Sequence, residues 1–149
     1  MTIATNHHPM TENFPSAAAR HWTESCFLAA EAHWQEAAYL AGYAAECSLK
    51  ALVELGGVLG RPLGHDLVAL SGPGLEMAVL LNPRLRRLQN PLVCATASGL
   101  PPWSETQRYE ATSARPPSEY EAMTRSSCEM ARIVLTNLTL DGDWQEVSE

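Results

Sequence analysis

The chain has 149 residues, of which 46% are hydrophobic, and its formal net charge at pH 7 is −7. This size and composition are typical of one folded domain and exclude a wholly disordered chain. One lysine (Lys50) and nine arginines give little clustered positive charge, which disfavours non-specific binding to nucleic acid through phosphates.

No apolar run approaches the roughly 18 to 20 residues of a membrane helix. The N-terminus lacks the basic start and apolar segment of a secretory signal. We therefore expect a cytoplasmic protein with no membrane segment.

The four cysteines are Cys26, Cys47, Cys94 and Cys128, and they are widely spaced, with no CxxC pair or zinc-finger spacing. Three of them fall in helical patterns, where a free cysteine behaves as a small buried hydrophobe. We expect no metal site and no cofactor.

Residues 1–15 are polar and contain prolines, which predicts a flexible N-terminal segment. Ser16 is predicted to cap a first helix that ends near Ala32. The apolar face of this helix is expected to carry Trp22, Cys26 and Ala29.

A second helix is predicted from Gln35 to Leu55, because the Gly56-Gly57 pair is a C-terminal signal. Its apolar positions recur at helical spacing and contain several small residues, which let a partner helix approach closely. The predicted buried stripe is Ala38, Ala41, Ala45, Leu49 and Leu52.

Shorter elements are expected in the middle of the chain. A helix at residues 65–70 is predicted to be broken at 72–74 and followed by a helical segment at 75–81. Asn82-Pro83 predicts a short basic helix to about Gln89. The five prolines of residues 90–118 exclude a long regular element there.

The last helix is predicted from the capping box Ser118–Glu121 to about Leu138. One face of it is apolar at helical spacing: Tyr120, Met123, Ser127, Met130, Val134 and Leu138. Together these elements predict an all-α fold, a four-to-five-helix up-down bundle over residues 16–140, followed by an acidic C-terminal tail at 141–149.

Three motifs carry a resemblance to a known family. They are the run Ala37–Leu52 with its Glu-x-x-x-Lys-Ala-Leu ending, Gly64-His65-Asp66-Leu67, and Trp103 with Arg108-Tyr109. In this order they resemble HEPN domains. The resemblance covers residues 16–138 and implies a HEPN-like, often dimeric helical bundle associated with nucleotides or RNA.

The resemblance also implies a setting in toxin–antitoxin pairs or phage defence, with a nucleotidyltransferase or another defence-system protein as partner. The family's known activity is metal-independent RNA cleavage by an Arg followed a few residues later by a His in the last long helix. No histidine follows His65 in this chain, and the nearby Arg61 and His65 are closer together and precede that helix. These departures favour a binding protein over an enzyme.

Glu46 and Lys50 stand four residues apart, the favoured order for an ion pair on an exposed helix face. The alternative is that Lys50, with Glu46 beside it, points into a cleft and meets a phosphate. His65 either has a structural role, as a helix cap or in a hydrogen bond at the edge of the core, or acts as a general acid/base or ligand contact. Asp66 in the first turn complements the helix dipole and is also a ligand-binding candidate.

Arg108 and Tyr109 are candidates for stacking on a base or holding a phosphate. They could equally fasten the proline-rich segment to the bundle, with Trp103 as a buried anchor. Tyr39 and Tyr43 share a helical face and favour interhelix packing.

The sequence thus predicts a homodimeric binding and regulatory module for a nucleotide or RNA, with Lys50, His65 and Arg108 as its principal residues. One alternative is an atypical metal-independent ribonuclease, with His65 as the acid/base and Arg61 or Arg108 stabilising the phosphorane. The other is a structural subunit of a larger assembly.

Overall fold

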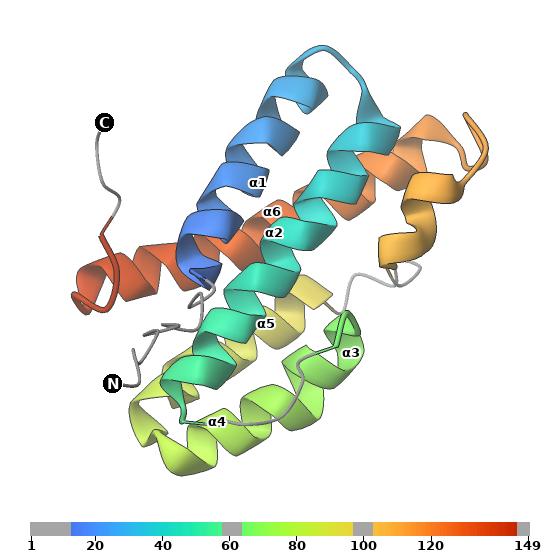
Figure 1. Cartoon of the computed structure of the whole chain (residues 1–149). Helices are drawn as coiled ribbons and strands as arrows, with labels where there is room; N and C mark the ends of the chain where they lie inside the picture. Colours follow the sequence, from blue (N-terminus) through green and yellow to red (C-terminus); the bar gives the residue numbers. More distant parts are fainter. Residues whose placement is uncertain (1–12, 58–63, 97–102, 146–149) are drawn as a thin grey trace, which may run out of the picture.

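The computed structural model describes residues 13–57, 64–96 and 103–145, and every regular element within them is helical. The predicted all-α class is therefore confirmed. Three long helices form the frame: α1 (Phe14–Ala30), α2 (Trp34–Leu55) and α6 (Pro117–Leu140). Helix α2 packs against both of the others, and Figure 1 shows α6 crossing behind α1 and α2.

The first helix differs from its prediction at its start and on its buried face. Its N-cap is Asn13, whose side chain accepts a hydrogen bond from the Ser16 amide at 3.1 Å, so the helix begins three residues earlier than expected. The residues that it buries fully are Ala18 and Ser25, whereas Cys26 is exposed. Residues 1–12, most of the predicted flexible segment, lie outside the described residues.

The second helix has the predicted C-terminal end and buries the predicted stripe, since Ala38, Ala41, Ala45, Leu49 and Leu52 have no exposed surface. It ends at Gly56, where a side chain would be impossible without movement. A Cβ built on Gly56 would lie 2.6 Å from the Cα of Ala78. Close approach of the backbones fixes this helix end.

The predicted break at residues 72–74 is wrong. Asp66 caps α3 (Leu67–Ala69) and a π-helical turn, η1 (Leu70–Gly74), continues directly into α4 (Leu75–Leu81). A π-turn inserts one residue into the helix and bends it. This geometry accommodates Pro73, which has no N–H to donate, without ending the helix.

The predicted basic helix is a 3-10 turn, η2 (Pro83–Leu88), which leads into a further helix, α5 (Gln89–Thr96). The prolines of residues 90–118 were predicted to exclude a long regular element, and α5 is a short one. Pro91 lies in its first turn, where the amide of a helical residue has no partner within the helix. A second 3-10 turn, η3 (Glu105–Tyr109), starts from a capping box of Ser104 and Gln107.

The last helix begins at Pro117, and the capping box predicted for Ser118 is absent, since the N-cap is Pro116 without a side-chain hydrogen bond. Proline suits the first helical position, because its fixed φ matches a helix and its missing N–H would have no partner there. The predicted apolar face is confirmed, because all of its members are buried: Tyr120, Met123, Ser127, Met130, Val134 and Leu138.

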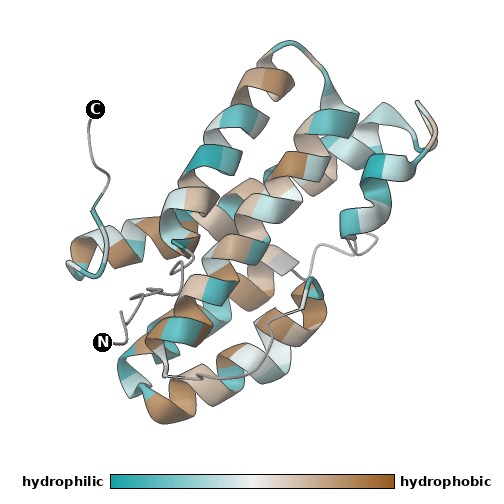
Figure 2. Cartoon of the chain, viewed as in Figure 1, coloured by the Kyte–Doolittle hydropathy of each residue, from teal (hydrophilic) through white to brown (hydrophobic). Residues whose placement is uncertain are grey.

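A main core lies between α1, α2, the α3–α5 layer and α6, and a smaller one joins Ala38, Trp103, Tyr120 and Met123. Hydrophobic residues also remain on the outer side of α4, at the lower edge of the molecule (Figure 2), where Leu80 is 74% exposed. No helix among the described residues is long and apolar enough to cross a membrane.

Candidate functional site

Glu46 and Lys50 lie one turn apart on α2 and form an ion pair with 2.7 Å between Lys50 Nζ and Glu46 Oε1. The pair is not on an exposed helix face as expected: Glu46 is 1% exposed and Lys50 8%. The ring of Phe14 on α1 lies 5.7 Å from Nζ. Burial of both charges makes each depend strongly on the other, because neither can be hydrated in its place.

His65 binds the same carboxylate oxygen. Its Nδ1 lies 2.5 Å from Glu46 Oε1, while the histidine side chain is 49% exposed. A carboxylate can only accept, so Nδ1 carries the hydrogen and Nε2, on the opposite side of the ring, is left for another partner. The other oxygen, Glu46 Oε2, is buried and receives no hydrogen bond from the described residues.

Tyr43 is the aromatic centre of this region. Its ring lies edge-on to His65 at 6.5 Å between centroids and to Trp103 at 4.8 Å, and His21 on α1 lies 5.5 Å away. Burial raises the pKa of the Tyr43 phenol far above its ordinary value, and the hydrogen bond with Tyr39 adds to this. Tyr43 is therefore a neutral hydrogen-bonding group, not a base.

Trp103 fastens the 103–109 segment to α2. Its Nε1 donates a 3.1 Å hydrogen bond to the carbonyl oxygen of Tyr39. Its ring rests on Gly42, where a built Cβ would lie 2.0 Å from Nε1. Glycine is needed here because the indole occupies the space of any side chain. Trp103 is thus the buried anchor considered for this segment, 7% exposed.

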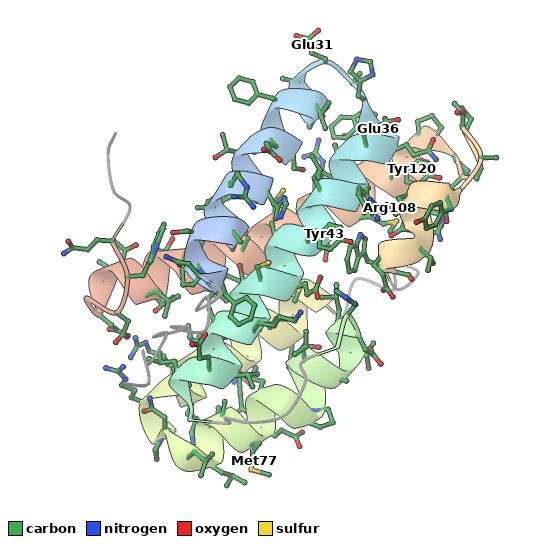
Figure 3. All side chains as sticks on the ribbon, in the orientation of Figure 1. Glu31, Glu36, Tyr43, Met77, Arg108 and Tyr120 are labelled. Atoms are coloured by element: carbon green, nitrogen blue, oxygen red, sulfur yellow. The ribbon has the colours of Figure 1, made fainter. Side chains whose placement is uncertain are left out.

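The anchored segment brings η3 beside Tyr43. Figure 3 shows Tyr43 on α2 and Arg108 on η3 next to each other, and Arg108 is close enough to oppose the rise in the Tyr43 pKa. The guanidinium of Arg108 lies over the ring of Tyr109 at 5.5 Å, and both residues are exposed. They form a cationic, aromatic rim to the site.

His21 is a member of the site that sequence reasoning missed. Its ring packs on Tyr43, and burial lowers its pKa, with a smaller contribution from the neighbouring Arg20. His21 is therefore held neutral. Only the pairing of α1 with α2 brings it here, and no local motif around His21 signals that contact.

The structure thus brings together Glu46, Lys50 and His65, with Arg108 and Tyr109 at the rim. Asp66, beside His65, has its carboxylate engaged in capping α3, at 2.9 Å from the Val68 amide nitrogen. Arg61 lies outside the described residues.

Two arginines of the basic η2 segment, Arg84 and Arg87, are paired with carboxylates outside the site formed by Glu46, Lys50 and His65. Arg84 forms two hydrogen bonds with Asp143, at 2.9 and 3.0 Å, and Arg87 pairs with Asp141. These pairs also hold the start of the acidic C-terminal tail. In the described part of the chain, no group of three His, Cys, Asp or Glu side chains could hold a metal ion.

Comparisons of the chain with protein-family models, curated proteins and solved structures returned no match. The chemistry of the site must therefore be argued from its own geometry. A buried carboxylate holds an imidazole in one orientation, and the ring of Tyr43 lies edge-on to this imidazole.

Proposed function

We propose that the protein is a HEPN-like binding and regulatory module that binds the phosphate of a nucleotide or of an RNA end at His65. The observation that carries the proposal is the shared oxygen of Glu46, which contacts both Lys50 and His65. Glu46 and Lys50 cancel each other's charge, so protonation of His65 leaves the group with a net positive charge. An imidazolium Nε2–H is a strong donor to a phosphate oxygen.

The rim supports a nucleotide over a bare phosphate. Arg108 can add a forked contact to the phosphate, and the exposed ring of Tyr109 can stack on a base. The three segments of the HEPN resemblance also meet around one residue, since Tyr43 contacts both His65 and Trp103. Lys50 contributes through Glu46, because its Nζ is buried in the ion pair.

A binding titration tests this proposal. We would compare an RNA oligonucleotide with a 5′-phosphate, the same oligonucleotide without it, and adenosine monophosphate. Loss of one charge-assisted hydrogen bond in His65→Gln should weaken phosphate-dependent binding by about tenfold or more. Arg108→Gln should weaken it as well.

Matched controls are available for both variants. His33→Gln removes an exposed histidine that makes no side-chain cap, and Arg125→Gln removes an exposed arginine paired with Glu121 on α6. Both should bind as wild type does. Phosphate-dependent affinity that is unchanged in His65→Gln would refute the site, and no affinity for any of the three probes would refute the function.

A second candidate function, an atypical metal-independent ribonuclease, is favoured by the same Glu46–His65 hydrogen bond. A carboxylate that orients an imidazole and leaves Nε2 outward is an arrangement suited to general-base catalysis. This function also needs a cation at the scissile phosphate. Of the two arginines considered for that role, Arg108 is exposed and belongs to the rim.

Assembly is part of the proposal. The HEPN resemblance implies a homodimer and a nucleotidyltransferase or other defence-system partner. The exposed hydrophobic side chains of α4, Met77, Leu80 and Leu81, support an association surface at the lower edge of the molecule. Met77 is labelled there in Figure 3.

A further inference from the structure

The crossing of α1 over α6 brings together two thiols that are far apart in the sequence. Ser25 on α1 is fully buried, donates a 2.9 Å hydrogen bond to the carbonyl oxygen of Ala37, and has its Oγ 3.7 Å from Cys128 Sγ on α6. The next residue on α1 is Cys26, and it is near enough to Cys128 to contribute to the rise in the pKa of that thiol. With Ser25 in contact with Cys128, the two cysteines lie close together where α1 crosses α6.

The two thiols differ in their access to solvent. Cys26 is exposed and borders an open groove of about 490 Å³, whose other lining residues are Trp22, Thr23, Phe27 and Ala30. Cys128 is half-buried beneath α1, and burial raises the pKa of its thiol to about 11, against the opposing effect of the Ser25 hydrogen bond. A reagent from solution therefore meets Cys26 first.

We propose that Cys26 and Cys128 are a thiol pair that closes to a disulfide between α1 and α6 by exchange with a small disulfide such as oxidised glutathione. The Cys26 thiolate attacks one sulfur of that disulfide, forms a mixed disulfide and releases one glutathione thiolate. Cys128 then loses its proton to solvent and attacks Cys26 Sγ, which releases the second. Two protein thiols are oxidised and one small disulfide is reduced.

Closure would fix α1 on the bundle. Helix α1 contributes Phe14 and His21 to the surroundings of Lys50 and Tyr43, so the disulfide holds one wall of the candidate site. The new bond encloses most of the chain, and cross-links over long loops restrict the unfolded chain most. The proposal does not depend on what the site binds.

The test uses the full chain with oxidised glutathione, followed by alkylation of free thiols, digestion and mass spectrometry. Trypsin alone leaves Cys26 and Cys47 in one peptide, residues 21–50, so a glutamate-specific protease is added to cut after Glu31 and Glu36. The expected product is a cross-link between the Cys26 peptide and the Cys128 peptide. Its mixed-disulfide precursor on Cys26 should accumulate at neutral pH.

The rate of closure gives a second readout. Between pH 7 and 9 the rate of the second step should rise roughly tenfold per pH unit, because the thiolate fraction of Cys128 grows by that factor below its pKa. The closed form should melt about 5 to 10 °C above the reduced form. Cys26→Ser should show neither the cross-link nor the higher melting temperature after treatment with oxidised glutathione.

The remaining cysteines supply controls. Cys94→Ser removes an exposed thiol outside the pair and should close as wild type does, whereas Cys128→Ser should stop at the mixed disulfide. Complete glutathionylation of Cys26 at pH 9 without a cross-link, in protein with unchanged circular dichroism, would overturn the proposal. Cross-linking of Cys26 to Cys94 or Cys47 in preference to Cys128 would overturn it too.

Discussion

One carboxylate oxygen of Glu46 contacts both Lys50 and His65 inside the bundle. Because Glu46 is buried, these contacts determine how much the ion pair contributes to the free energy of unfolding. A buried ion pair adds little stability over a hydrophobic pair of the same shape, because both ions lose their hydration. Removal of one partner costs much more, since the other charge stays buried alone. At the scale of single residues, substitution of Glu46 or Lys50 alone should therefore destabilise the protein strongly, whereas substitution of both together should destabilise it little.

We predict that Glu46→Gln lowers the free energy of unfolding by about 2 to 4 kcal/mol, because Lys50 keeps its charge without a carboxylate. The double variant Glu46→Gln, Lys50→Met should recover most of that loss, since no charge remains buried. Urea denaturation followed by circular dichroism measures both. A Glu46→Gln variant as stable as wild type would show that the Lys50 ammonium group becomes hydrated when its partner is removed.

Tyr120 gives a prediction for alkaline pH. The phenol donates a 2.7 Å hydrogen bond to Glu110 Oε2, and burial followed by this hydrogen bond raises its pKa from 10.0 to about 12. A raised folded-state pKa stabilises the fold below pH 10, and this contribution disappears as the pH rises from 10 to 12. Between pH 10 and 12 the free energy of unfolding should fall less in Tyr120→Phe than in wild type, with a difference on the order of 1 to 2 kcal/mol. Equal losses in both proteins would contradict the prediction.

At the scale of elements, regular periodicity predicted the long helices well. The stripe from Ala38 to Leu52 and the Gly56-Gly57 stop determine α2 locally, and the face from Tyr120 to Leu138 determines α6. Boundaries were less predictable, because Asn13 and Ser16 are both good caps and the choice between them depends on the packing of α1.

Local rules predicted the helical segments at 75–81 and 83–88 but not the continuity of the chain through residues 70–75. Glycine and proline at 72–74 ordinarily end a helix, yet a π-turn carries the chain through them and places α4 against Gly56. The site shows the same limit. The spacing of Glu46 and Lys50 predicted their ion pair, but its burial depends on Phe14 and His65, which come from other segments.

The contact between Gly42 and Trp103 allows a prediction about how η3 is held. Gly42→Ala would favour the helix intrinsically by about 1 kcal/mol, but the new Cβ would overlap the indole. We expect a net loss of stability of about 1 to 3 kcal/mol, because the indole must move off α2. Susceptibility of the 103–109 segment to proteolysis should rise as well.

A matched glycine variant separates this overlap from the general effect of the substitution. Gly72→Ala adds a Cβ that has no neighbour within 4 Å, also in a helical segment. Gly72→Ala should therefore not lower the stability of the protein, because its new methyl group overlaps no other atom. A Gly42→Ala variant that melts at or above wild type would show that Trp103 does not fasten the segment.

At the scale of the whole molecule, the exposed hydrophobic residues of α4 and the HEPN resemblance together predict a homodimer. Light scattering at micromolar concentration should return twice the chain mass of 16.3 kDa. Leu80→Glu, at a side chain 74% exposed, should shift the mass to that of one chain without lowering stability. A single-chain mass for wild type across a concentration series would contradict the dimer.

The whole molecule also sets the expectation for catalysis. The net charge of −7 repels RNA at long range, so productive binding depends on local contacts. Helix α6, where the HEPN cleavage motif would lie, contains no histidine, and its arginines Arg125 and Arg132 pair with Glu121 and Glu129 on the same helix. The site around His65 therefore has an oriented imidazole without the family's arrangement of cations.

We predict that the isolated protein has little or no ribonuclease activity. General-base catalysis by His65 would contribute about 10² to 10⁴-fold only if a cation also stabilised the developing phosphorane charge. RNA incubated with the protein and a chelator should remain as intact as with His65→Ala. If wild type cleaves RNA under these conditions, and His65→Ala abolishes cleavage with an unchanged melt, the enzyme function replaces the binding one. Cleavage that persists in His65→Ala would place the activity outside this site, and a preparation repurified to constant specific activity would then separate a second site from a contaminant.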